Sequence, residues 1–149
     1  MSMVDREYTP PMLLTETSET VGFFAAARQG IMTVEQCTAC GRLRHPPRVV
    51  CPICRSFDRQ WQPVSGRGQV WSWIVVHPPL LAGFDELAPY NVITVEIVED
   101  SSIRFIGNLV AAAGGPPNEI NPANIEIGEP VHAVFAMAED LPVLQWVRG

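Results

Sequence analysis

The sequence contains no lysine: its ten basic residues are all arginine, and sixteen acidic residues bring the formal net charge to −6. Proteins that coat polyanions are usually strongly basic, so this charge argues against that class. Charged residues make up only 17% of the chain, whereas proline and glycine number 14 and 11. This balance is untypical of coiled coils and helical bundles, and it favours short strands joined by turns.

Long apolar runs are also missing. No stretch approaches the roughly 18 to 20 uninterrupted apolar residues of a membrane-spanning helix, so we expect no membrane span. Residues 1–15 include Asp5, Arg6, Glu7 and two prolines, and not a basic start followed by an apolar run. No secretory signal is therefore expected, and the protein is predicted to be cytoplasmic. In that reducing compartment, cysteines rarely form disulfides.

Familiar catalytic patterns are absent as well. The sequence has no G-x-S-x-G, no H-E-x-x-H, no phosphate-binding G-x-x-x-x-G-K and no dinucleotide-binding G-x-G-x-x-G. Its three histidines stand outside any such frame, and they are expected to be structural. We therefore expect no catalytic residue in this chain.

The four cysteines form two C-x-x-C pairs separated by ten residues: Cys37, Cys40, Cys51 and Cys54. Each pair can present two thiolates from one tight turn, and zinc takes four such ligands in a tetrahedron. The pattern predicts a zinc ribbon, with Gly41 in the turn after the first pair. A redox dithiol, which needs only one pair, and an iron centre are the alternatives. Four protein ligands leave no open position, so the metal is expected to be structural.

Six of the ten arginines lie between Cys37 and Gly68, a stretch with a single acidic residue, Asp58. They are Arg42, Arg44, Arg48, Arg55, Arg59 and Arg67. Guanidinium groups can offset the excess negative charge of four thiolates around one dication. They can equally form a surface for phosphates or for an acidic partner, and the sequence leaves both interpretations open.

A short helix is predicted between Thr15 and Gly30. Ser18 or Thr20 can cap its first turn, apolar residues then follow helical spacing, and Gly30 is a natural stop. Phe23 and Phe24 are adjacent, and adjacent residues on a helix point about 100° apart. Both rings can be buried only if the helix has contacts on more than one side. Those contacts are expected from the protein's own core, with a partner's groove as the alternative.

Apolar patterning predicts five strands after the ribbon. Their ranges are 69–77, 90–99, 103–110, 131–137 and 143–147, with a hairpin turn at 99–102. In the first strand, strict alternation places Trp71, Trp73 and Val75 on one face and Val70 on the other. Five strands with long connections at 78–89 and 111–130 fit a Greek-key barrel of the OB type better than a sandwich, which usually has about seven. The expected fold is therefore mainly β: a tail at 1–17, a helix plus four-cysteine zinc ribbon at 18–66, and a five-stranded OB-fold domain at 67–149.

The order of these motifs resembles one family. The segments are GFFAAARQG, the ribbon VEQCTACGRLRHPPRVVCPIC, the strand VSGRGQVWSWIVVH, the strand PYNVITVEI and the closing IGEPVHAVF. Together they resemble the domain-of-unknown-function family that joins an N-terminal rubredoxin-like zinc ribbon to a C-terminal OB fold associated with acyl-CoA. The resemblance runs from about Val21 to Trp146. Its most specific parts are the PPR of Pro46–Arg48, the SGRG of Ser65–Gly68 and the entry to a strand at Pro89-Tyr90.

This resemblance implies a non-catalytic partner of thiolase-superfamily enzymes, either acyltransferases or the retro-aldol lyases that shorten steroid side chains. The barrel is then expected to border the path of an acyl-CoA. We expect the helix and ribbon to dock the thiolase-like enzyme through Phe23, Phe24, Arg28 and Arg48, because an aromatic pair and arginines lie there.

Two other classes stay open. A single-stranded nucleic-acid-binding protein is one, because Trp71, Trp73, Phe105 and Arg104 could form a stacking face on an OB fold. The acidic strand region, with Glu96 and Glu99, argues against it. A stand-alone acyl-CoA-binding protein is the other.

Overall fold

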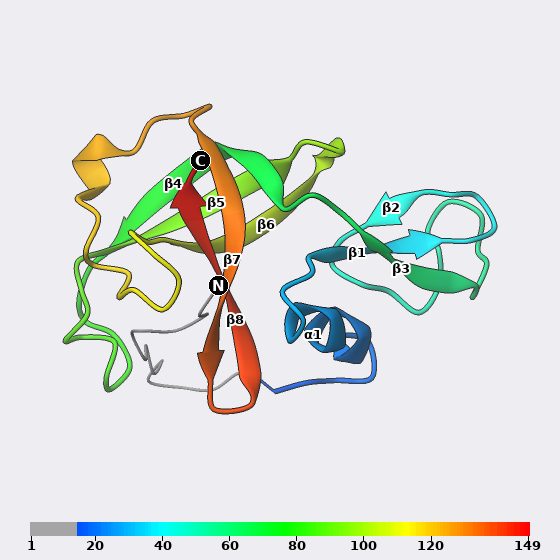
Figure 1. Cartoon of the computed structure of the whole chain (residues 1–149), viewed down its shortest axis with the longest axis horizontal. Coiled ribbons are helices and arrows are strands. Elements are labelled where there is room, and N and C mark those ends of the chain that lie inside the picture. The colour runs from blue at the N-terminus through cyan, green and yellow to red at the C-terminus, as the bar shows by residue number, and fades with distance from the viewer. Residues whose placement is uncertain (1–14) are drawn as a thin grey trace.

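The structure is a computed structural model that describes residues 15–149. Most of the predicted tail, residues 1–14, lies outside the described residues. The described residues form one α-helix, a small three-stranded sheet and a five-stranded barrel, with the helix beside both (Figure 1). No helix in the described part of the chain is long and apolar enough to cross a membrane. The mainly β architecture with a short N-terminal helix, a four-cysteine ribbon and an OB-type barrel is confirmed.

The helix is α1, Val21–Ala27. Thr20 is its N-cap residue, but its hydroxyl makes no capping bond to the helix and instead accepts a 2.9 Å hydrogen bond from the Thr17 N–H. The predicted side-chain cap is therefore wrong, because the preceding turn uses the hydroxyl. At the other end, Gly30 adopts a φ of 74°, and the Ile31 N–H donates to the Ala26 carbonyl at 3.0 Å. Gly30 thus ends the helical segment as predicted.

The small sheet holds the cysteines. Its strands are β1 (Thr33–Cys37), β2 (Leu43–Arg44) and β3 (Arg59–Pro63), in the order β2-β1-β3 and all antiparallel. The two turns that connect them carry the C-x-x-C pairs. None of these three strands was predicted, because they are short and polar residues interrupt their apolar pattern.

The barrel contains β4 (Arg67–Val76), β5 (Tyr90–Ile97), β6 (Asp100–Leu109), β7 (Pro130–Ala138) and β8 (Leu141–Arg148). Their order is β4-β5-β6-β8-β7, and pairing of β7 with β4 closes the barrel. Strands β6 and β8 are parallel, and all other pairs are antiparallel. A short 3-10 turn, Pro122–Asn124, lies in the long connection before β7.

Two details of the strands differ from prediction. A register shift between Val70 and Ser72 breaks the alternation of β4, so Val70 is buried, Trp73 packs against the core and Trp71 is 47% exposed. Strict alternation placed Trp71 with Trp73, and the β-bulge is why this was wrong.

The β5–β6 turn also lies earlier than predicted. It consists of Val98 and Glu99, and Asp100 already pairs with Ile97. The register shifts at this point, so the following serines belong to an irregular part of β6. The predicted turn at 99–102 is therefore wrong, because the polar residues 100–102 belong to the exposed start of β6.

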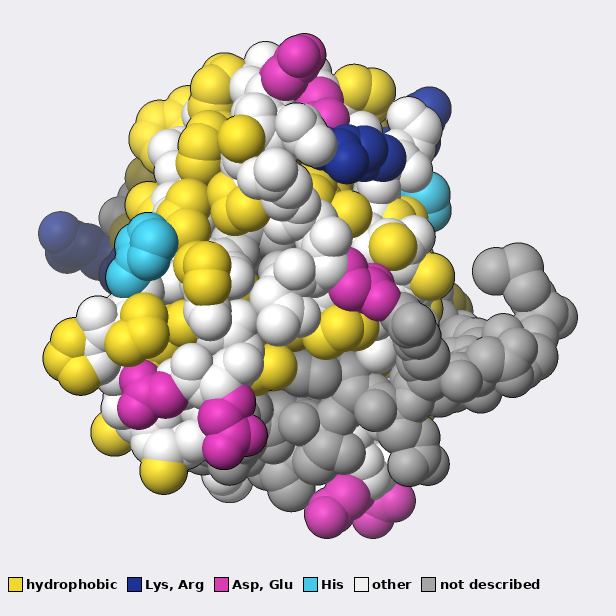
Figure 2. Space-filling model, turned by 90° about the vertical axis from the view of Figure 1, so that its left-hand side faces the viewer, with side chains coloured by type: hydrophobic (Ala, Val, Ile, Leu, Met, Phe, Trp, Pro, Cys, Tyr) yellow, Lys and Arg dark blue, Asp and Glu magenta, His cyan; other side chains and the backbone are white. Residues whose placement is uncertain are grey.

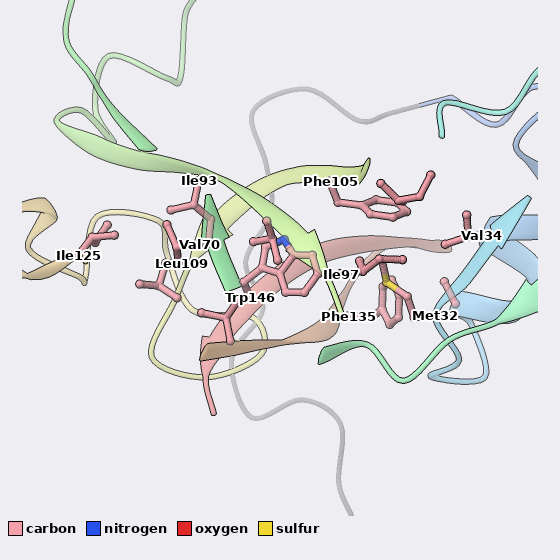
Figure 3. Packing of buried hydrophobic residues seen from close by; sticks show 14 residues of the cluster. Met32, Val34, Val70, Ile93, Ile97, Phe105, Leu109, Ile125, Phe135 and Trp146 are labelled. Carbon is pink, nitrogen blue, oxygen red and sulfur yellow. The ribbon is translucent and has the colours of Figure 1, made fainter. Parts of the chain in front are cut away.

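One apolar core joins the helix, the ribbon and the barrel. Met32 and Val34 project from the ribbon side toward Phe105, Phe135 and Ile97 of the barrel, as Figure 3 shows. Trp146 lies fully buried within the barrel. The ribbon is thus packed onto the barrel and not merely tethered to it.

The end of the molecule opposite to the ribbon carries the two long connections, at 77–89 and 110–129 (Figure 1). Figure 2 shows this end, where apolar side chains are interspersed with acidic and other polar groups. Two buried amides fasten the second connection to the barrel. Asn91 donates to the Pro117 carbonyl at 3.1 Å, and Gln145 accepts from the Gly114 N–H at 2.8 Å.

Candidate metal centre and junction groove

The four predicted ligands come together at one point. The sulfurs of Cys37 and Cys54 lie 3.5 Å apart, those of Cys40 and Cys51 lie 3.7 Å apart, and all four lie within 4.8 Å of one another. A tetrahedron with zinc–sulfur bonds of about 2.3 Å has edges of about 3.8 Å. The donor set and its spacing therefore fit a four-coordinate zinc ion. Among the described residues, this cluster is the one group of three or more side chains that could hold a metal.

Each C-x-x-C turn is closed by backbone hydrogen bonds. The Gly41 N–H donates to the Cys37 carbonyl at 2.8 Å, and the Arg55 N–H donates to the Cys51 carbonyl at 2.9 Å. Gly41 and Arg55 each directly follow the second cysteine of a pair, and both adopt a positive φ, 78° and 64°. Glycine was expected at the first of these positions, whereas the second turn places an arginine in the left-handed region.

Backbone hydrogen bonds in the turns favour ionisation of two of the sulfurs. A backbone hydrogen bond from Cys40 lowers the pKa of Cys37, and those from Cys54 and Ile53 lower the pKa of Cys51 to about 6. At Cys54 a backbone hydrogen bond from Ser56 favours the thiolate, but the neighbouring sulfurs, Cys37 first, raise the pKa to about 11. A bound cation would offset this repulsion between sulfurs, because a thiol that coordinates a metal is deprotonated.

A buried carboxylate binds two of the arginines near this cluster, and no sequence motif pointed to it. Glu35 on β1 is 1% exposed and forms ion pairs with Arg44 at 2.5 Å and with Arg59 at 2.8 Å. Its carboxylate also accepts a 2.9 Å hydrogen bond from the Arg48 backbone N–H. One side chain thus ties together all three ribbon strands and the turn that leads to the second cysteine pair.

Arg44 connects this network with the sulfurs. Its burial favours the neutral form, but the hydrogen bond and charge of Glu35, followed by the Cys51 thiolate, raise the pKa of Arg44. Part of the arginine cluster therefore offsets thiolate charge, as one of the two interpretations expected.

The two phenylalanines predicted to bind a partner lie at the junction of the three parts. Phe24 is buried, and Phe23 packs against the core. The ring centroid of Phe23 lies 6.5 Å from that of Trp61 in the ribbon and 6.2 Å from that of Phe105 in the barrel. Much of this aromatic pair is therefore used within the molecule.

The two arginines that were predicted to bind a partner have different surroundings. Arg28 forms an ion pair with Glu16 and donates a 3.0 Å hydrogen bond to the Asp140 carbonyl. Arg48 keeps an exposed side chain. Their role in docking stays a prediction, and Arg48 is the one of the four with a side chain that is exposed and makes no ion pair among the described residues.

A groove of about 480 Å³ opens where helix, ribbon and barrel meet. Its walls are mostly apolar, with Pro47 and Trp61 from the ribbon and Ile106 and Leu144 from the barrel. The imidazole of His45 also lines the groove.

Stacking holds His45 in place. Its ring lies over Phe105, with the ring centroids 3.9 Å apart and the planes 26° from parallel. Part of the side chain stays exposed, but loss of water around the ring lowers the pKa of His45 to about 4. The groove therefore presents a neutral imidazole at neutral pH.

The residues proposed for a nucleic-acid stacking face do not assemble into one. Phe105 is buried in the core, and Trp73 packs against that core. Trp71 is exposed, but the Arg104 guanidinium covers its ring at 3.8 Å and also pairs with Glu96 at 3.3 Å. The structure offers no open aromatic platform at these positions.

The fold and the four-sulfur cluster define a protein in which a zinc-ribbon module is packed on an OB-type barrel. Residues 24–58 match the family model described as the rubredoxin-like zinc ribbon domain of ChsH2, and residues 61–136 match that of the C-terminal OB-fold domain of ChsH2. The chain belongs to the ChsH2 family.

Relatives agree with this assignment. The chain is 42% identical over 109 residues to a probable enoyl-CoA hydratase alpha subunit of Thermomonospora curvata, covering 73% of this chain and 30% of that protein. It is 32% identical over 105 residues to a DUF35 domain-containing scaffold protein of Methanothermobacter thermautotrophicus, covering 70% and 71%. A chain of a solved structure described as the Ltp2-ChsH2(DUF35) aldolase superposes with a TM-score of 0.76 and 35% identity, over 91% of this chain and 98% of that one. The chain thus spans less than a third of the first relative and most of the other two.

Proposed function

We propose that this chain is a non-catalytic accessory subunit that binds and supports a thiolase-superfamily enzyme acting on acyl-CoA thioesters. The enzyme would be an acyltransferase or a retro-aldol lyase, in the degradation of steroid or other lipid side chains. The observation that carries the proposal is the near-complete superposition on a chain of the Ltp2-ChsH2(DUF35) aldolase. A 28% identical relative in Mycobacterium tuberculosis, described as the alpha subunit of a hydratase of 3-oxo-4,17-pregnadiene-20-carboxyl-CoA, supports the link to steroids; this chain spans 43% of it.

The metal has a structural role in this proposal. Cys37, Cys40, Cys51 and Cys54 would hold Zn²⁺ with all four positions filled by protein, which leaves none for water or substrate. The ion then fixes the two turns, and with them the network around Glu35. A cytoplasmic location remains a prediction from the sequence.

The test is to purify the tagged chain from its native cells and identify what co-elutes by mass spectrometry. We expect a thiolase-like enzyme in near-equal amount. That enzyme is then produced with and without this chain, and its soluble yield and its turnover of acyl-CoA thioesters are measured. We expect both to fall sharply without the chain.

A matched control separates support from mere co-expression. The Cys40→Ser variant removes one metal ligand, so it should fail to rescue the enzyme, whereas substitution of the exposed Leu81 by serine should rescue it fully. A thiolase-like enzyme with full yield and activity alone would contradict the proposal.

A second candidate function, direct binding of an acyl-CoA by this chain, is favoured by the junction groove. Its apolar walls and its volume of about 480 Å³ suit an acyl chain. Calorimetry with a series of CoA thioesters of increasing chain length tests it. Binding that strengthens with chain length and is lost in Leu144→Asp would support it, and no heat with any ester would end it.

A further inference from the structure

The second cysteine turn presents an unusual concentration of exposed apolar side chains. We call residues 48–57 the second-knuckle surface. Its exposed apolar members are Val49 (52%), Val50 (39%), Ile53 (59%) and Phe57 (70%). Single exposed apolar residues are ordinary, but four within nine residues of one turn are a local concentration of the kind that marks interaction sites.

This exposure does not come from a loose end of the chain. The Cys51 N–H donates to the Ser56 carbonyl and the Arg55 N–H donates to the Cys51 carbonyl, both at 2.9 Å. The Asp58 N–H donates to the Ser56 hydroxyl at 3.0 Å. The segment is thus a closed turn anchored at two metal-ligating cysteines, and it presents its apolar side chains in a preorganised form.

Cationic groups surround the apolar ones. Arg48 and Arg55 belong to the surface itself, and Arg42 lies in the first cysteine turn. Arg42 shares a hollow with Ile53 and with Asp100 at the start of β6, the one acidic residue that lines this hollow. All three arginine side chains are exposed, and none makes an ion pair among residues 15–149. By contrast, Arg44 and Arg59 are bound by Glu35.

The charge of this surface is opposite to that of the rest of the molecule. The whole chain has a net charge of −6, whereas residues 42–57 contain no acidic residue and three exposed arginines that make no ion pair among the described residues. Complementary charge steers partners and fixes their orientation. Free phosphates would use the arginines, but they would leave four apolar side chains in water. A protein surface satisfies both sets of groups.

We infer that the second-knuckle surface is where this chain docks on its protein partner, and that the partner offers an apolar hollow bordered by aspartate and glutamate side chains. The inference rests on the proposed function for the identity of the partner. The expected contact with the partner thus moves away from Phe23 and Phe24, which are largely internal, to the outer end of the ribbon. This end lies on the far side of the molecule from the 77–89 connection (Figure 1). Arg48 is common to both surfaces.

The test uses the full chain in its native cells. A photo-crosslinking phenylalanine analogue replaces Phe57, and in a matched control it replaces Leu81, which is equally exposed at 69%. Leu81 belongs to the 77–89 connection, which lies at the opposite end of the molecule from the ribbon (Figure 1). We expect position 57, and not position 81, to crosslink to a peptide of the co-purifying enzyme that contains both acidic and apolar residues. Arg48→Glu and Phe57→Ser should each weaken binding to that purified enzyme by about tenfold or more. Arg67→Glu and Leu81→Ser should not.

Each result decides. If the enzyme co-purifies but position 57 does not crosslink to it, or if all four substitutions bind alike, the surface is overturned while the proposed function stands. If position 57 crosslinks to an acidic surface of a protein that is not an acyl-CoA enzyme, the surface stands and the proposed function fails. Crosslinks only to a second copy of this chain, or to no protein, overturn the surface. The zinc content of every variant is measured, to check that the ribbon is intact. If an acidic residue at the crosslinked site of the partner is changed to arginine and this restores binding of the Arg48→Glu variant, the result would support direct contact.

Discussion

At the scale of single residues, a few buried polar side chains decide how the ribbon is built. Glu35 is the clearest, because its carboxylate is fully enclosed and receives two guanidinium groups and one backbone N–H. A buried ion pair adds little net stability compared with apolar residues, but removal of one partner leaves an uncompensated buried charge. The geometry of the ribbon therefore depends on this carboxylate more than its place in a polar-looking strand indicates.

We predict that Glu35→Gln lowers the free energy of unfolding of the zinc-loaded protein by about 3 kcal/mol, because Arg44 keeps its charge in a buried site. Urea unfolding followed by circular dichroism measures it. Glu96→Gln is the matched control: it removes a more exposed pair with Arg104 and should cost less than about 1 kcal/mol. Equal effects of the two substitutions would contradict the structural role of Glu35.

The second prediction at this scale concerns His45. Contact with Phe105 desolvates the imidazole and lowers its pKa to about 4, below the value of about 6.5 in an unfolded chain. Between these two pH values the unfolded state binds more protons, so this group makes stability fall as the pH drops from about 6.5 to 4. The effect is absent above that window.

Titration of the His45 ring proton by NMR measures the pKa directly, with the signal assigned by its loss in His45→Gln. Phe105→Ala removes the stacked ring and should move the pKa of His45 back toward its ordinary value. An ordinary pKa in the wild-type protein would show that the ring is hydrated and not stacked.

At the scale of elements, sequence patterning located the barrel well and the ribbon sheet poorly. The five barrel strands contain enough consecutive or alternating apolar residues to be visible, and both ends of α1 were placed to within a few residues. Strands β1 and β3 are five residues long and β2 is two, and their pairing depends on the cysteine turns and on Glu35. Such strands have no independent pattern to read.

The same limit applies to the candidate site. The spacing of the cysteines alone predicted the cluster, because C-x-x-C geometry is local. Whether Phe23, Phe24 and Arg28 are buried or paired within the molecule depends on which residues the folded chain places opposite them. The spacing of residues in the sequence does not encode this. The bulge in β4 likewise has no local signal, and it turns Trp73 toward the core while Trp71 stays exposed.

The contact of α1 with the ribbon leads to a prediction at this scale. Gly22 lies against Trp61, and a Cβ at this position would overlap the indole ring. Alanine in a helix is usually about 1 kcal/mol better than glycine. Here we predict the opposite sign: Gly22→Ala should destabilise the protein by about 1 to 2 kcal/mol, because Trp61 must move.

A double-mutant cycle checks the cause. In a Trp61→Ala background the overlap is gone, and Gly22→Ala should then stabilise by about 0.5 to 1 kcal/mol. Chemical denaturation of the four proteins gives the coupling. If Gly22→Ala has the same effect in both backgrounds, Trp61 does not pack on the helix.

At the scale of the whole molecule, the ribbon and the barrel share one core, and this has a measurable consequence for the metal. Met32 and Val34 lie in the same buried cluster as Ile97, Phe105 and Phe135. Metal binding and folding are coupled in structural zinc sites, so loss of the ion should disorder the ribbon. The barrel would then expose the apolar surface that the ribbon covers.

We predict that Cys40→Ser, and removal of zinc by a chelator, raise amide hydrogen exchange in strand β5 by about tenfold or more as well as in the ribbon. Val49→Ser is the control, because it changes an exposed residue of the same turn region and leaves all four sulfurs in place. Hydrogen exchange followed by mass spectrometry resolves the two parts. Rapid exchange confined to residues 33–63, with β5 still protected, would mean that the barrel folds without the ribbon and that the shared core contributes little. Exchange that rises in both parts would mean that the metal stabilises the whole fold, so a partner bound at the outer end of the ribbon would also be linked to the stability of the barrel.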